Sequence, residues 1–211
     1  ERYEWLNQFQ DAKGVYQRII QNSPGSPYAS KSKLRIAKAN IMYLVYSKEY
    51  DAVEDALNKM ISDFKGNPEL SQAVFIIGEK YLLDANAPDY CKKAIKIFEK
   101  VMYELPHSDA VPGMYAEVYY CAGRCYTELM DYPKALTCYE KIVNEYPDFT
   151  YAWYAQYMVG YTYQRMKDKG LVDTKEADPK TKAAYQQLIS KWPGCSDAGN
   201  AQTWLNEHKS N

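Results

Sequence analysis

Tyrosine is the residue type whose abundance and spacing in this sequence could do chemistry. There are 22 tyrosines among 211 residues, and Tyr154, Tyr157 and Tyr161 stand at positions i, i+3 and i+7. This spacing places the three side chains on one face of a helix. A tyrosine offers an apolar ring with a polar hydroxyl at its tip, which suits binding more than bond-making. Rings that pack between neighbouring helices show the same spacing, so a binding face and a packing face both stay open.

Residue types suited to catalysis or metal binding are few. His107 and His208 are the two histidines, and the four-residue spacing of Cys121 and Cys125 is not that of a zinc ribbon. Phosphate-binding glycine loops and nucleophile elbows are absent from the sequence. The five cysteines are predicted to be buried, with a Cys125–Cys138 disulfide as the alternative for an exported protein; they are Cys91, Cys121, Cys125, Cys138 and Cys195. The sequence therefore predicts a non-catalytic protein without a metal or cofactor.

Charge and hydropathy narrow the class of partner. The chain carries 26 basic and 27 acidic residues, a net charge of −1, which disfavours a nucleic-acid partner and a polybasic membrane surface. Apolar runs are short, such as the five residues Val74–Gly78, and none approaches the roughly 20 residues that cross a bilayer. We therefore expect protein partners and no membrane span. The first residues do not form an export signal, which leaves open whether residue 1 follows a removed signal segment.

An internal repeat positions these residues. An alanine precedes an aromatic residue by four positions and a proline by twelve in Ala12–Pro24, Ala94–Pro106 and Ala135–Pro147. A copy beginning at Thr181 keeps the aromatic and the proline, and one beginning at Val53 keeps only the apolar rhythm. The copies start at 12, 53, 94, 135 and 181, so the first four are 41 residues apart. Such a period is typical of a helical repeat protein.

Each copy predicts an antiparallel helical hairpin. From Ala135 the apolar residues form one helical stripe, which Pro147 ends. Gly78, Gly123 and Gly160 lie in the helices upstream, and their small size predicts close approach to Ala94 and Ala135 in the second helices. We expect an all-α chain of about ten or eleven helices in one domain over 1–211. The last helix is predicted at 195–208, after a polar loop at Lys167–Pro179.

The repeat resembles a known family. Tyr119-x2-Ala122-Gly123-x2-Tyr126, followed by Ala135-x3-Tyr139 and Pro147, is similar to the tetratricopeptide repeat. The resemblance implies a right-handed superhelical solenoid of hairpins that binds other proteins. The residues after the terminal prolines are similar to bacterial envelope members, namely the outer-membrane assembly lipoprotein and the Tol–Pal-associated periplasmic protein. This similarity implies a periplasmic or extracellular location, with the cytoplasm as the alternative.

In that family the first helix of each hairpin lines a concave groove. The resemblance therefore implies a partner-binding groove whose predicted residues are Phe75, Tyr120, Tyr154, Tyr157, Tyr161 and Arg165. Arg124 is a second cation that could face inward, but Glu79, Glu117 and Glu128 fall at comparable positions, so we expect a weakly charged groove. The main prediction is a scaffold for protein–protein interaction or assembly. A peptide-binding or glycan-binding aromatic groove is an alternative.

The two ends of the solenoid suggest another alternative, self-association. Tyr3, Trp5, Leu6 and Phe9 crowd the start of the chain, and Trp204 and Leu205 lie on a last helix without a following partner. An exposed apolar edge at each end predicts a head-to-tail contact that closes into a ring or continues as a filament or tube. The competing interpretation is a polar cap, because Asn206, Glu207, His208 and Lys209 follow.

Overall fold

The computed structural model describes residues 9–83, 88–107, 111 and 113–208. These residues form ten α-helices and one short π-helix, and none of them is in a strand, which confirms the all-α prediction. The helices group into two compact units, residues 1–112 and 113–211, which are described separately below. The expectation of one domain over 1–211 stays a prediction. None of the helices in the described ranges is both long enough and apolar enough to cross a membrane.

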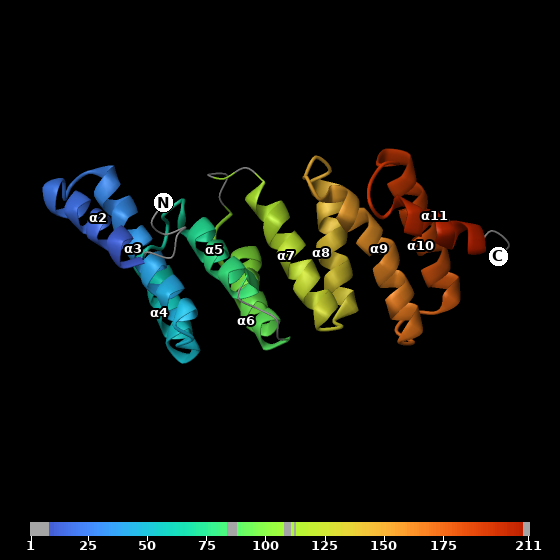
Figure 1. Cartoon of the computed structure of the whole chain (residues 1–211), viewed down its shortest axis with the longest axis horizontal. Helices are drawn as coiled ribbons and strands as arrows, with labels where there is room; N and C mark the ends of the chain where they lie inside the picture. The colour runs from blue at the N-terminus through green and yellow to red at the C-terminus, as the bar shows by residue number, and fades with distance from the viewer. Residues whose placement is uncertain (1–8, 84–87, 108–110, 112, 209–211) are drawn as a thin grey trace. The chain divides into compact units, whose positions relative to one another are not determined.

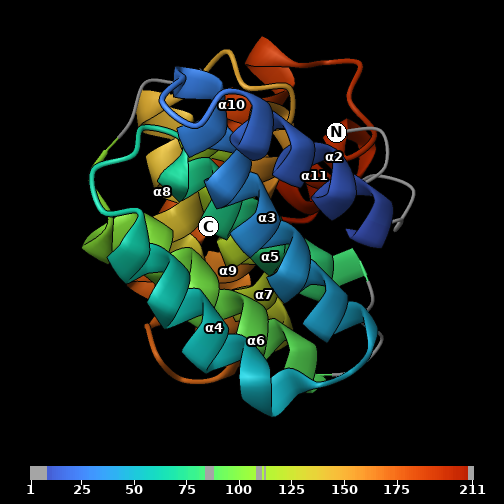
Figure 2. The same cartoon turned by 90° about the vertical axis from the view of Figure 1, so that its left-hand side faces the viewer.

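The described residues of unit 1 form five α-helices and the π-helix. Their bounds are α2 Phe9–Asn22, α3 Pro27–Tyr46, α4 Tyr50–Asp63, α5 Leu70–Leu83, α6 Pro88–Glu99 and η1 Lys100–Glu104. Helix α3 packs against α2, α4 and α5, and α5 packs against α6 (Figures 1 and 2). The Ser26 side chain accepts a hydrogen bond from the Ala29 backbone N–H at 3.2 Å and so caps the start of α3.

The described residues of unit 2 form five helices. Their bounds are α7 Met114–Glu128, α8 Tyr132–Glu145, α9 Ala152–Asp168, α10 Thr174–Lys191 and α11 Ala198–Glu207. Each helix packs against the next along the chain (Figure 1). All five repeat starts predicted from the sequence fall within the even-numbered helices, α2 to α10.

The close helix contacts join a glycine to an aromatic ring. A Cβ added to Gly160 would lie 2.5 Å from Cε1 of Tyr185, and one added to Gly78 would lie 2.5 Å from Cε1 of Phe98. Gly123 meets Tyr139 in the same way, at 2.9 Å. The sequence placed these glycines opposite alanines, but the ring four residues after the repeat start occupies the space. We call these three contacts the glycine–ring junctions.

Two predicted boundaries were wrong. The predicted loop at Lys167–Pro179 is largely helical: α9 ends at Asp168, α10 begins at Thr174 and Pro179 lies within α10. The Asp173 side chain accepts a hydrogen bond from the Glu176 backbone N–H at 2.9 Å and starts the helix before the proline. The last helix begins at Ala198 rather than at residue 195, because the preceding Pro-Gly-Cys-Ser-Asp segment favours a turn.

Candidate functional site

Four aromatic rings gather in unit 2 where α7 and α9 meet the turn between α8 and α9. We call Tyr120, Phe149, Tyr151 and Tyr154 the aromatic cluster. Tyr120 lies at its centre, stacked on Tyr151 with ring centroids 5.0 Å apart and an interplanar angle of 15°. Phe149 and Tyr154 meet Tyr120 edge-on, at 5.9 and 5.6 Å. The rings therefore hold one another in orientations that aromatic pairs prefer.

The aromatic cluster packs against a buried ring on one side and is exposed to solvent at Tyr151. The Tyr154 ring meets Tyr139 edge-on at 6.3 Å, and Tyr139 is fully buried at the junction with Gly123. The Tyr139 hydroxyl also shares a hydrogen bond of 3.2 Å with the Thr127 hydroxyl. Tyr151, in contrast, leaves 44% of its surface exposed. A rigid apolar surface with a half-open edge is suited to binding another molecule.

Arg124 supplies positive charge beside the aromatic cluster. It lies one helical turn after Tyr120 in α7, with its guanidinium carbon 5.5 Å from the centroid of the Tyr120 ring. The side chain is exposed, and no carboxylate within the described ranges forms an ion pair with it. Burial raises the pKa of Tyr120, with Arg124 opposing the shift, so the phenol is neutral at physiological pH. The cluster can therefore offer a cation and neutral hydroxyls to an acidic ligand.

The remaining predicted groove residues of unit 2 lie in different surroundings. Tyr157 stacks on Tyr185 at 5.5 Å and on Tyr161 at 6.4 Å. It also packs against the buried cluster of Tyr185, Leu188 and Ala201, so it stabilises the junction between α9, α10 and α11. Arg165 forms an ion pair of 3.0 Å with Asp168 on its own helix. The assignment of Tyr157, Tyr161 and Arg165 to a binding groove stays a prediction.

Phe75 does not line a groove, and this prediction was wrong. Only 4% of its surface is exposed, and its ring lies 5.9 Å from that of Phe98 in the core of unit 1. Helix α5 is apolar around most of its circumference, with Leu70, Val74 and Ile77 also buried. A helix of this kind buries more than one face, so spacing alone does not identify its exposed side.

Phe149 and Tyr151 were not predicted as site residues. Both lie in the Pro147-Asp-Phe-Thr-Tyr turn, where helical periodicity gives no information about side-chain direction. The available signal was the presence of two large aromatic residues in a turn that otherwise contains proline and polar residues.

The predicted self-association ends are only partly described. Tyr3, Trp5 and Leu6 and the side chain of Phe9 lie outside the described residues. Trp204 and Leu205 are half-buried against Tyr185 and its buried neighbours, and the Trp204 ring stacks on His208 at 4.1 Å. Head-to-tail association stays a prediction.

The cysteines form no disulfide. Cys121, Cys125 and Cys138 are buried, and Cys91 and Cys195 are half-buried. Over the described ranges, no group of three or more His, Cys, Asp or Glu side chains is placed to hold a metal ion.

Comparison with known proteins places the chain among helical repeat proteins. The family model described as Tetratricopeptide repeat matches residues 2–26 and 117–148. The second match covers most of α7 and all of α8, which together form one hairpin containing the Gly123–Tyr139 junction.

The chain is also similar to two longer proteins over a larger part of its sequence. The chain is 30% identical over 122 residues to ER membrane protein complex subunit 2 of Xenopus tropicalis and to subunit 2-A of Xenopus laevis. Each alignment covers 58% of this chain and 36% of the relative, so the chain spans about a third of the length of these relatives.

Two solved structures are similar at low identity. MamA MSR-1 C2 has a TM-score of 0.46 and 16% identity, covering 90% of this chain and 92% of that one. A thermophilic TPR protein of Thermus thermophilus has a TM-score of 0.43 and 13% identity, covering 97% of this chain and 94% of that one. The family model matches parts of this chain, and together with the repeated hairpins it supports a tetratricopeptide-repeat solenoid.

Proposed function

We propose that this protein is a non-catalytic scaffold that binds a segment of another protein through the aromatic cluster of unit 2. Tetratricopeptide repeats are typical of protein–protein interaction scaffolds, and the match at residues 117–148 includes Tyr120 and Arg124. The observation that carries the proposal is a group of four rings, anchored on a buried junction, beside an arginine without a carboxylate partner in the described ranges.

The chemistry of the cluster defines the segment it would bind. The exposed ring of Tyr151 favours an apolar or aromatic side chain, since burying such surfaces stabilises a complex. Arg124 favours an aspartate or glutamate next to that side chain, because a guanidinium binds carboxylates with charge-assisted hydrogen bonds. Rings of this kind also stack on sugars, but a neutral glycan would leave Arg124 without a counter-charge. We therefore favour an acidic, aromatic-containing peptide over a glycan.

The similarity to these relatives favours a eukaryotic setting for the proposed function. The 30% identity with ER membrane protein complex subunit 2 of frogs favours a eukaryotic protein over the bacterial envelope setting expected from the sequence. The name of those relatives describes a subunit of a complex, and we propose that this chain is likewise a member of a multiprotein assembly.

Selection from a displayed peptide library tests the proposed function. Random 12-residue peptides are panned against the immobilised chain, and the enriched peptides are then tested on Tyr151→Ala and Arg124→Gln variants. We expect enrichment of peptides that combine an acidic with an aromatic residue, and loss of their binding to both variants. The matched control is Tyr28→Ala, which removes an exposed tyrosine of unit 1 (71% exposed) and should leave binding unchanged. Peptides that bind all variants equally, or a selection without enrichment, would contradict the proposal.

A further inference from the structure

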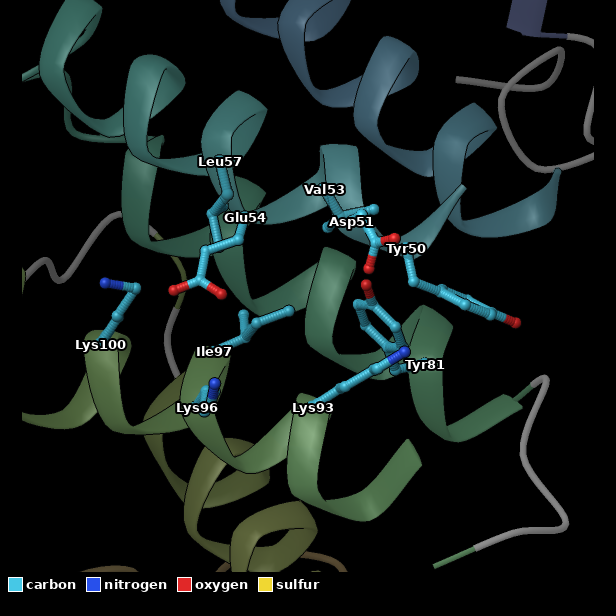
Figure 3. A pocket seen from close by; sticks show the side chains of 10 residues that line it. All are labelled: Tyr50, Asp51, Val53, Glu54, Leu57, Tyr81, Lys93, Lys96, Ile97 and Lys100. Atoms are coloured by element: carbon cyan, nitrogen blue, oxygen red, sulfur yellow. The ribbon is translucent and has the colours of Figure 1, made fainter. Parts of the chain in front are cut away.

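A pocket opens in unit 1 between the two second helices α4 and α6. Its volume is about 250 Å³, and its lining residues, shown in Figure 3, are Tyr50, Asp51, Val53, Glu54, Leu57, Tyr81, Lys93, Lys96, Ile97 and Lys100. Pockets for drug-sized ligands measure roughly 300–1,000 Å³. This pocket therefore suits one small molecule, about the size of an amino acid.

The two walls of the pocket carry opposite charges. Helix α4 contributes the carboxylates Asp51 and Glu54, whereas α6 and the π-helix contribute the three lysines. Glu54 reaches from α4 toward the side of Lys96 and Lys100 (Figure 3). Even so, no ion pair within the described ranges joins the two walls.

The charged side chains of the two walls differ in whether they already interact with other residues of the chain. Lys93 lies over the Tyr50 ring, 3.9 Å from its centroid, and Lys100 forms an ion pair of 3.4 Å with Glu104. Lys96 and Glu54 are exposed, and neither forms an ion pair or hydrogen bond with another described residue. These two side chains are therefore the cation and the anion available to a ligand.

The interior of the pocket is apolar. Val53, Leu57 and Ile97 are buried side chains in its lining. Leu57, which also lines the pocket, stands at the repeat position where α6, α8 and α10 carry an aromatic ring. Tyr50, which lines the pocket, shares a hydrogen bond of 2.9 Å between its hydroxyl and that of Tyr90 across α4 and α6.

Beside the pocket, the α-helical geometry of α6 changes to that of a π-helix. Helix α6 continues directly into the π-helix Lys100–Glu104, where the Leu105 N–H donates to the Lys100 carbonyl at 2.9 Å. Single π-helical turns occur often at functional sites. This π-helix begins at Lys100, a residue of the pocket wall.

We propose that this pocket binds a small zwitterion with an apolar body, such as an aromatic amino acid. The ligand ammonium faces Glu54 and Asp51 on α4, and its carboxylate faces Lys96 and Lys100 on the other wall. Its apolar side chain occupies the interior beside Leu57 and Ile97. A purely anionic ligand would meet the two carboxylates of α4, and a purely cationic one would meet the lysines, so the walls select a molecule with both charges.

Three probes that share a phenyl ring separate these possibilities. L-phenylalanine carries both charges, 3-phenylpropionate only the carboxylate, and phenethylamine only the ammonium. We measure the affinity of the whole chain for each by isothermal titration calorimetry at low ionic strength. Phenylalanine should bind roughly threefold to fivefold more tightly than either analogue, since exposed charge pairs contribute modestly. No binding of phenylalanine, or equal affinity for 3-phenylpropionate, would overturn the proposal.

Two charge-removing variants sharpen the test. Glu54→Gln should abolish the preference for phenylalanine over 3-phenylpropionate, and Lys96→Gln should abolish its preference over phenethylamine. The control is Lys59→Gln, which removes an exposed lysine on α4 that pairs with Asp63 and should leave all affinities unchanged. If Glu54→Gln and Lys96→Gln also leave the preferences intact, the oppositely charged walls do not select the ligand.

Discussion

The two units are built on the same internal junction but differ in what they expose. Unit 1 joins Gly78 to Phe98, and unit 2 joins Gly123 to Tyr139 and Gly160 to Tyr185. On its surface unit 1 has a pocket with oppositely charged walls, whereas unit 2 has a cluster of stacked tyrosines beside a single arginine. The difference shows that the repeat specifies the packing, while the residues outside the junction determine which side chains each unit exposes.

Adding a methyl group at the junctions should have the largest effect on stability in both units. Gly78→Ala and Gly160→Ala each place a Cβ about 2.5 Å from a buried ring, and overpacking of this kind costs about 1–3 kcal/mol. At about 2–4 °C per kcal/mol for a protein of this size, we expect melting temperatures lower by about 2–12 °C, measured by circular dichroism.

The matched controls are glycines of the same units with open space around them. Gly14→Ala in α2 and Gly199→Ala in α11 meet no atom within 4 Å, and helix propensity should make them neutral or stabilising by up to about 1 kcal/mol. If a junction variant and its control have the same melting temperature, the glycine–ring junction is not a shared feature of the two units.

Within unit 2, replacing two different tyrosines by alanine should change the free energy of unfolding by different amounts. Tyr157→Ala removes a ring that packs on buried Tyr185 and should destabilise the protein by about 1–2 kcal/mol. Tyr151→Ala removes a ring that is 44% exposed and should change stability by less than about 0.5 kcal/mol. Chemical denaturation of both variants measures the difference. Equal losses would mean that the aromatic cluster is part of the core.

A smaller effect is expected in unit 1 at high pH. Burial, followed by the neighbouring Tyr50 and Glu54, raises the pKa of Tyr81 to about 12, against about 10 in the unfolded chain. Because the unfolded state loses this proton first, the contribution of Tyr81 to stability is present below pH 10 and is lost as the pH rises toward 12. Tyr81→Phe should therefore lose less stability than the parent between pH 10 and 12, in urea unfolding at each pH. Tyr28→Phe, at an exposed position, is the control, and a parent-like slope in Tyr81→Phe would contradict the assignment.

The hairpins were predictable from the sequence because each helix carries its own local signal. The spacing from Ala135 to Tyr139 and on to Pro147 recurs through the chain, and the structure places every copy in an even-numbered helix. The Lys167–Pro179 segment was missed because its polar residues and proline suggest a loop, whereas Asp173 caps a helix there.

The binding surfaces were harder to predict because they combine residues from separate elements. Phe149 and Tyr151 belong to a turn, where no periodicity indicates that they pack on Tyr120. Glu54 and Lys96 are about 40 residues apart, and each is typical of a solvated helix face on its own. Only the packing of α4 and α6 around α5 places their charges on opposite walls of one pocket.

The central claim is that a protein partner binds at the aromatic cluster of unit 2. Its most direct test is ¹⁹F NMR of two proteins, one with 3-fluorotyrosine at position 151 and one with 3-fluorotyrosine at position 28, titrated with a peptide enriched in the library selection. The account predicts that the resonance of the residue at position 151 shifts with peptide concentration until saturation, while that at position 28 in unit 1 does not move. A peptide that binds without shifting the resonance at position 151 would contradict the claim.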